Sequence, residues 1–293
     1  MSVTAAVLLG ALAALAIYYI ARWVLIIRQR AREQPAAPGL LYLSVGFVTN
    51  FFDTWGIGSF APTTSVFKLL RLVPDERIPG TLNAGHALPT VTQALIFIVI
   101  VSVDPLTLVT MIAAAVAGAW LGAGIVARLP RRAIQIGMGV ALLAAAILFL
   151  LVNLNLLPSG GEALGLRGGL LACAVAVNFL LGALMTVGVG LYAPCLILVS
   201  LLGANPVAAF PIMMGSCAFL MPVGGLRFIT SGRYDLRAAL GLAIGGIPGV
   251  LLAAFVVKKL PLLYLRWLVV FVVLYAAVAM LRAARAEAPQ VEA

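Results

Sequence analysis

The sequence predicts an all-α polytopic membrane protein made of two inverted repeats, each with a re-entrant broken-helix hairpin and three spans, preceded by one extra N-terminal span. Three observations lead to this fold class. The 293 residues are 64% hydrophobic and only 10% charged, with a mean hydropathy of +1.17, which leaves too little polar surface for a water-soluble globule. A glycine- and proline-rich motif interrupts a hydrophobic segment. That motif recurs in the second half of the chain.

The excess of basic residues is explained by membrane topology. A net charge of +10 would suggest nucleic-acid binding in a soluble protein, but here the arginines and lysines stand at the ends of apolar runs. We therefore expect a lipid bilayer and no nucleic acid as partner. No basic residue precedes the first apolar run, Val3 to Ile27, whereas Arg28, Arg30 and Arg32 follow it. This order predicts an uncleaved first span whose N-terminus is outside the cell.

The first interrupted segment is Asn50 to Pro62, NFFDTWGIGSFAP. Gly56 and Gly58 loosen the backbone, and Pro62 lacks the amide hydrogen that a continuous helix would use. The pattern predicts a half-length helix before the break and a second short apolar piece, Thr63 to Leu72, after it. Broken backbone at membrane depth is tolerated where protein buries it or where it lines a wet cavity. The segment is therefore a candidate site wall in a re-entrant hairpin.

The same motif recurs at a constant offset. The matching positions are Thr54, Gly56, Ile57, Gly58, Phe60, Ala61 and Pro62 in the first copy, and Thr186, Gly188, Val189, Gly190, Tyr192, Ala193 and Pro194 in the second. Flanking landmarks such as Asp104 and Asp235, or Gly118 and Gly249, keep the register. The predicted division is 1–38 for the N-terminal span and basic loop, 39–152 for the first repeat, 153–167 for a connecting loop, 168–284 for the second repeat and 285–293 for the tail.

Three spans are expected after each broken segment. They are Ile78–Val103, Leu106–Ala127 and Ala133–Val152 in the first repeat, and Val207–Thr230, Leu236–Val257 and Pro261–Leu281 in the second. If the broken segments crossed the membrane, Arg128, Arg131 and Arg132 would fall outside, against the positive-inside tendency. Re-entrant segments make the repeats inverted and place most basic residues, with the C-terminus, in the cytoplasm. Lys258 and Lys259 are among the exceptions, and the re-entrant arrangement is favoured.

The glycine-rich breaks are candidate anion sites. Free backbone amides, and any helix N-terminus beyond the break, point partial positive charge into a cavity. Small residues also allow close helix packing, which is the alternative explanation. The duplication favours a functional role. The candidate substrate-binding residues are Asn50, Thr54, Gly56, Gly58, Asn83, Thr186, Gly188, Gly190, Tyr192 and Arg227.

Asp53 and His86 are the acid and the histidine expected within the hydrocarbon layer, and they are the candidates for proton coupling. Asp53 has an alternative role as the cap of a half helix, and His86 as a hydrogen-bonded packing residue. Asn83, His86 and Thr90 are spaced so that a helix puts them on one face. The second repeat lacks both titratable groups. Arg227 either binds an anion or snorkels to the membrane surface.

Catalysis and cofactors are not expected. The sequence has no G-x-x-x-x-G-K-[Ser/Thr] phosphate loop, and Cys173, Cys195 and Cys217 lie apart in apolar stretches, without zinc-ligand spacing. An enzyme that used Asp53 and His86 is a third alternative, but it would lack a nucleophile. The driving force is then an ion gradient or the gradient of the substrate itself.

The two halves resemble the sulfite exporter TauE/SafE family of bacterial inner-membrane permeases. The resemblance covers about Gly39 to Leu281 and rests mainly on GFVTNFFDTWGIGSFAPTTSVFKLL and IPGTLNAGHALPT. It implies a multi-pass protein of the bacterial inner membrane that transports a small anion, such as sulfite, thiosulfate, an organosulfonate or a carboxylate. Together with the residue pattern, it leads us to expect a proton-linked secondary transporter, acting as an exporter. A passive anion channel on the same scaffold is the alternative.

Overall fold

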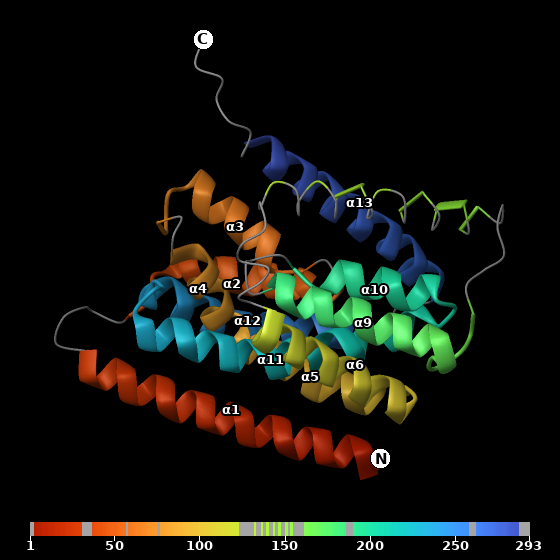
Figure 1. The fold of residues 1–293 in the computed structure, drawn as a ribbon. Helices are drawn as coiled ribbons and strands as arrows, with labels where there is room; N and C mark the ends of the chain where they lie inside the picture. Colours follow the sequence, from red (N-terminus) through yellow and green to blue (C-terminus); the bar gives the residue numbers. More distant parts are fainter. Residues whose placement is uncertain are drawn as a thin grey trace.

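A computed structural model describes residues 3–30, 37–56, 58–74, 77–122, 161–185, 190–257 and 262–286, together with scattered positions between 132 and 154. Its named elements in this part are all helical (Figure 1). They are α1 (Val3–Arg30), α2 (Leu40–Asp53), α3 (Phe60–Leu69), α4 (Ile78–Gly85), α5 (Ala87–Ile100), α6 (Pro105–Ala117), the π-turn η2 (Gly118–Gly122), α9 (Gly168–Met185), α10 (Tyr192–Leu201), the 3₁₀ turn η3 (Pro206–Ala208), α11 (Ala209–Ser231), α12 (Leu236–Val257) and α13 (Leu262–Ala286).

The predicted all-α polytopic membrane fold is confirmed. Within the described residues, five helical stretches are long and apolar enough to cross a membrane: Val3–Arg28, Ile78–Ile100, Gly168–Met185, Pro206–Ser231 and Leu236–Val256. The second predicted span of the first repeat is regular α-helix from Pro105 to Ala117 and a π-turn from Gly118 to Gly122, and its predicted end, 123–127, lies outside the described residues. Most of the third predicted span, 133–152, lies outside the described residues.

The first broken segment folds back on itself. Helix α2 ends at Asp53 and α3 begins at Phe60, so the helix is interrupted where the motif predicts it. The Tyr42 hydroxyl, near the start of α2, donates to the Leu72 carbonyl just beyond α3 at 3.3 Å. Helix α3 starts three residues earlier than predicted and contains Pro62, which the first turn of a helix tolerates. The result is a hairpin with the break at its tip.

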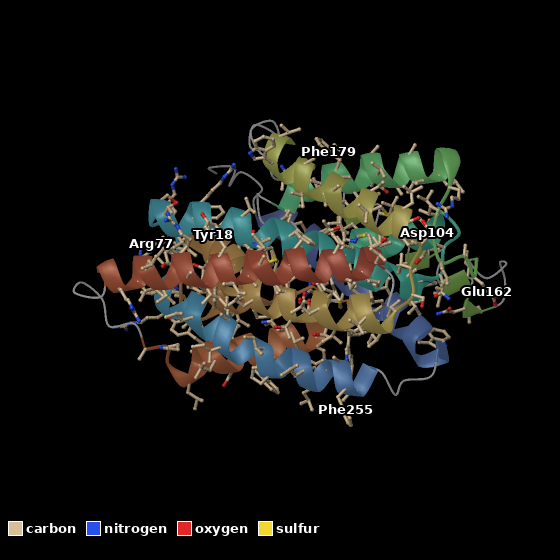
Figure 2. The ribbon with its side chains drawn as sticks, turned by 90° about the horizontal axis from the view of Figure 1, so that it is seen from below. Tyr18, Arg77, Asp104, Glu162, Phe179 and Phe255 are labelled. Carbon is tan, nitrogen blue, oxygen red and sulfur yellow. The ribbon has the colours of Figure 1, made fainter. Side chains whose placement is uncertain are left out.

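The second broken segment closes in the same way from the other end of the bundle. Helix α9 ends at Met185 and α10 begins at Tyr192, while Ala163, before α9, forms a bridge with Ala204, after α10. Figure 2 shows Arg77, which follows the first hairpin, and Glu162, which precedes the second, at opposite ends of the molecule. The two hairpins therefore enter the bundle from opposite ends, as an inverted duplication requires. The duplication itself and its repeat boundaries stay predictions.

Each half packs the first helix of its hairpin against the second span that follows the hairpin of the other half. Helix α2 lies along α12, and α9 lies along α6. A Cβ at Gly249 would collide with the Phe47 carbonyl, and a Cβ at Gly118 would collide with the Phe179 carbonyl. Gly118 and Gly249 are matched landmarks, and Phe47 and Phe179 are separated by the same offset as Thr54 and Thr186. Equivalent glycines thus allow equivalent close contacts in the two halves.

Helix α1 takes no part in this packing of α2 on α12 and of α9 on α6. Figure 1 shows it along one side of the bundle, with α13 on the opposite side. Its C-terminal half is attached by two buried hydrogen bonds: the Tyr19 hydroxyl donates to the Ala84 carbonyl at 2.8 Å, and the Trp23 indole donates to the Tyr234 hydroxyl at 3.3 Å. The extra N-terminal span is thus fixed to α4 and to the turn after α11.

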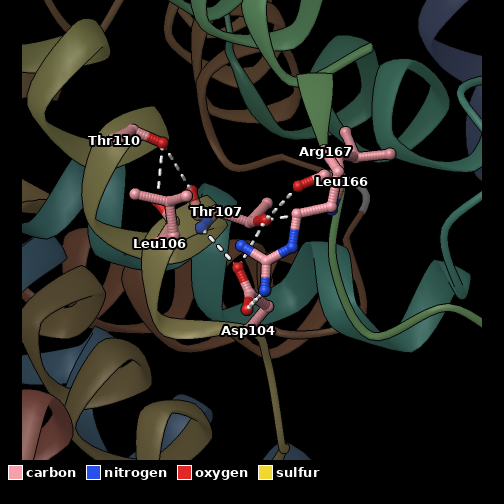
Figure 3. A network of polar contacts seen from close by, with 6 residues as sticks. All are labelled: Asp104, Leu106, Thr107, Thr110, Leu166 and Arg167. Carbon is pink, nitrogen blue, oxygen red and sulfur yellow. Dashed lines mark hydrogen bonds and ion pairs between the residues drawn. The ribbon is translucent and has the colours of Figure 1, made fainter. Parts of the chain in front are cut away.

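Asp104 joins the first half to the segment before α9 (Figure 3). Its carboxylate caps α6 by accepting from the Thr107 amide at 2.9 Å, and it forms an ion pair with Arg167. The Thr107 hydroxyl in turn accepts from the Leu166 amide at 2.9 Å. Burial alone would raise the pKa of Asp104, but the hydrogen bonds from Thr107 and the charge of Arg167 outweigh it and hold that pKa below its usual value. Asp235, its counterpart, caps α12 through the Ala238 amide at 2.8 Å.

We expect Asp104→Ala to lower stability by about 0.5–2 kcal/mol, because it removes the cap of α6 together with the ion pair. Asp104→Asn keeps an oxygen that can accept the cap hydrogen bond, so its loss should be smaller. Since the folded-state pKa is lowered, the ionic part of the stabilisation is present above the unfolded-state pKa of about 3.9 and disappears as the pH falls through the folded value. Thermal unfolding in detergent over this pH range tests the prediction. Equal losses for both variants at every pH would contradict it.

Candidate functional site

The tips of the two hairpins meet at a small buried cavity of about 20 Å³. Asp53, Gly58 and Ser59 line it from the first break, and Gly190, Leu191 and Tyr192 line it from the second. The remaining wall is formed by Phe60, Thr90, Met185, Cys217 and Met221. Residues more than a hundred positions apart in the chain therefore share one enclosed site.

Asp53 is the last residue of α2 and is 2% exposed. Its Oδ2 accepts from the Gln93 side-chain nitrogen at 2.8 Å. Ser59, on the far side of the break, hydrogen-bonds to the same carboxyl group through its hydroxyl and its backbone amide. Asp53 thus ties the two sides of the break together, which is the capping role that was the alternative for this residue. It also borders the cavity, which leaves the proton role open.

Gln93 connects the two halves of the site. It is fully buried on α5, and its Nε2 donates to Asp53 and, at 3.0 Å, to the Thr54 hydroxyl. Its Oε1 accepts from the Tyr192 hydroxyl at 2.5 Å. Gln93 is not among the site residues predicted from the sequence. A signal existed, because a lone amide within the apolar run ALPTVTQALIFIVI lies three residues after Thr90 and seven after His86, on the same helical face.

His86 lies at the junction of α4 and α5 and contacts both arms of the first hairpin. Its Nδ1 is 3.1 Å from the Asn50 Oδ1, and its Nε2 is 3.1 Å from the Thr63 hydroxyl. Asn50 donates through its Nδ2 to the Gly46 carbonyl at 2.7 Å, so its Oδ1 can only accept. His86 must therefore carry a proton on Nδ1, and a neutral ring accepts from Thr63 at Nε2. This arrangement holds α2 and α3 against α5.

The second half supplies mostly apolar and sulfur-containing groups. Met185 stands at the position equivalent to Asp53, and the Cys217 thiol lies 3.4 Å from the Met185 sulfur. Asn178 on α9 donates to the Met111 carbonyl at 2.7 Å and to the Ser216 hydroxyl at 3.2 Å. It joins α9 to α6 and α11 and does not line the cavity.

Not all candidate residues come together. Asn50, Thr54, Gly58, Gly190 and Tyr192 belong to the cavity or its hydrogen-bond network, as do Asp53 and His86. Gly56 faces hydrophobic side chains of α10 and α11. Asn83 and Arg227 line a different cleft, on the opposite face of α11. Thr186 and Gly188 lie outside the described residues.

A metal site finds no support in the described part of the chain, where no three His, Cys, Asp or Glu side chains are grouped. The side chains around the cavity instead offer hydroxyl groups, an amide, a single carboxyl group, the Cys217 thiol and the sulfurs of Met185 and Met221. Such a set suits hydrogen bonding to a small polar solute.

A model of the sulfite exporter TauE/SafE family matches residues 1–149 and 170–293. The chain belongs to this family. Neither the curated proteins nor the solved structures give a match. Membership confirms the predicted resemblance and identifies a membrane transporter of the sulfur-anion class, in agreement with the spanning helices. The family is one of transporters, which agrees with the expectation that the chain is not an enzyme.

The break itself supplies a stability test. Gly58 has φ of +84°, and a Cβ there would meet no atom within 4 Å, so substitution is opposed by backbone strain and not by a clash. We expect Gly58→Ala to lower stability by about 1–2 kcal/mol and Gly58→Asn to lower it less, because asparagine tolerates left-handed backbone better. Gly10→Ala, in α1 and also in open space, is the control and should not destabilise. Unfolding temperatures in detergent give the comparison, and a loss at Gly10 equal to that at Gly58 would refute it.

Proposed function

We propose that this chain is a secondary transporter that carries a small sulfur oxyanion or sulfonate together with a proton and acts as an exporter. The observation that carries the proposal is the meeting of two hairpin tips, which enter from opposite ends, at one small cavity lined by Asp53 and Tyr192. Paired discontinuous helices that meet inside the bilayer are a common basis of alternating access. Asp53 and the hydroxyl of Tyr192 place one group from each half at that point.

The cavity is in a closed state. A volume of about 20 Å³ holds roughly one water molecule, which is less than a sulfur oxyanion needs. Binding therefore requires the hairpin tips to separate. The hydrogen bond between Tyr192 and Gln93 joins the second break to the first half, so this bond has to break or rearrange when the site opens. The donors released, together with the Ser59 hydroxyl and the amides of both breaks, would then face the anion.

Charge supports coupling to a proton. Among the described residues that line the cavity, the one that can carry full charge at neutral pH is Asp53, and none is basic. An ionised Asp53 would repel a bound anion at low dielectric, so the anion and a proton on Asp53 favour each other's binding. A dianion carried with one proton moves a net charge of −1. An inside-negative membrane potential drives that charge outward by about 2.3 kcal/mol per 100 mV.

Flux into proteoliposomes tests the proposal, with sulfite, thiosulfate, sulfonates and carboxylates as the panel. We expect transport of at least one sulfur anion to respond to an imposed pH gradient at a fixed anion gradient. Asp53→Asn should keep anion exchange and lose the response to pH, whereas Asp104→Asn, outside the cavity, should behave as the wild type. Wild-type flux that ignores the pH gradient would indicate a passive channel. No flux of any anion would overturn the proposal.

Opening of the cavity can be followed at Cys217, which lines it and is fully buried. In a Cys173→Ser, Cys195→Ala background, we expect a maleimide to label Cys217 slowly. Tyr192→Phe removes the hydrogen bond to Gln93, worth about 0.5–1.5 kcal/mol, and should speed labelling about two- to tenfold. Tyr18→Phe, on the exposed face of α1, is the control. Unchanged labelling in Tyr192→Phe would exclude this bond as part of the closure.

A further inference from the structure

A second and larger cleft, of about 800 Å³, lies between α1, α6 and α11. Its walls are mostly apolar: Leu8 from α1, Val109 and Val116 from α6 and Val223 from α11 are aliphatic, and Trp120, Phe219 and Phe228 are aromatic. Arg227 and Asn83 are the polar side chains that reach it. A space of this size between spanning helices is filled by hydrocarbon in a membrane, since no water is available there.

The cleft is separate from the transport cavity. Cys217 and Met221, one turn apart on α11, face the small cavity, whereas Leu220, Val223 and Arg227 face the cleft. Helix α11 therefore stands between the two spaces.

The dimensions of the cleft match one acyl chain. It extends along α6 from Val109 to Trp120, which corresponds to roughly 17 Å of helix. One leaflet of the hydrocarbon core is about half of 30 Å. The wall formed by α1 is its N-terminal half, whereas the buried hydrogen bonds of α1 are made by Tyr19 and Trp23 farther along. A lipid chain would therefore occupy the space beside the part of α1 that those bonds do not hold.

The positive charge of Arg227 indicates which lipid head group would bind at the cleft. Arg227 lies one turn before the end of α11 at Ser231, and its side chain is exposed. Within the described part of the chain, no ion pair of Arg227 is found, and no acidic side chain lines the cleft. The Asn83 side chain donates to the Pro79 carbonyl and lies near Gly224, which places a second polar group beside the cleft. A guanidinium at the end of an apolar cleft fits a phosphate with an attached acyl chain.

We propose that this cleft binds one anionic phospholipid, with an acyl chain between α1, α6 and α11 and the phosphate at Arg227. In the predicted topology, this end of α11 faces the cytoplasm, where anionic lipid head groups attract basic side chains. A neighbouring copy of the chain is less suited to the cleft, because a packed helix would need to place an acidic side chain opposite Arg227 to avoid leaving a charge unpaired.

The test uses the purified full-length protein, depleted of lipid in detergent. Binding of phosphatidylglycerol and of phosphatidylcholine with the same acyl chains is measured by native mass spectrometry and by the shift in unfolding temperature. We expect the wild type to prefer phosphatidylglycerol. Arg227→Gln should reduce that preference about fivefold, and Arg282→Gln, an equal charge change on the exposed surface of α13, should leave it unchanged.

Val223→Trp distinguishes the acyl-chain site from a purely electrostatic surface effect, because it fills the cleft and keeps Arg227. It should weaken binding of both lipids. The proposal is overturned if the wild type binds both lipids equally, if Arg282→Gln reduces the preference as much as Arg227→Gln does, or if Val223→Trp binds both lipids like the wild type. A concentration-dependent dimer that Val223→Trp abolishes would assign the cleft to a second copy and would also overturn the proposal.

Discussion

The structure depends on satisfying the polar groups that two helix breaks create inside an apolar bundle. A backbone amide or carboxyl group without a partner at this depth would cost several kcal/mol. Here Ser59 and Gln93 hydrogen-bond to Asp53, and Tyr192 bonds to the other end of Gln93. Part of the hydrogen bonding of the first break therefore comes from Gln93 on α5, and Gln93 is in turn bonded to Tyr192 of the second break. The two breaks are stable inside the bundle because their tips meet and share hydrogen-bond partners. The cavity between the tips therefore lies inside the bundle.

The same constraint explains which parts of the fold were predictable from the sequence. Glycine and proline act locally, so the interruption between Asp53 and Phe60 could be placed before the structure was known. The packing of α2 on α12 and of α9 on α6 could not be predicted, because it depends on contacts between segments far apart in the chain. The matched Gly118 and Gly249 are the residues that allow this packing. Their role becomes clear only from the structure, where they lie against the backbone of Phe179 and Phe47.

The site was predictable only in part, for a related reason. Asn50, Asp53 and His86 were found because polar groups in apolar segments are conspicuous. Gln93 is equally conspicuous, but its importance comes from three partners on two other segments, and helical periodicity does not specify partners. The sequence predicts that Arg227 lies on a spanning helix, but it does not specify whether the side chain faces the predicted site. The structure puts it on the face away from Cys217 and Met221.

The network separates the roles of the two titratable groups. Among the described residues, no hydrogen bond joins His86 to Asp53 directly, and the amide groups of Asn50 and Gln93, which lie between them, hold their protons. His86 also does not line the cavity, whereas Asp53 does. If the proposed transport is coupled to a proton, Asp53 is therefore the group that would carry it. His86, whose two ring nitrogens contact Asn50 on α2 and Thr63 on α3, is better suited to holding the two arms of the hairpin together.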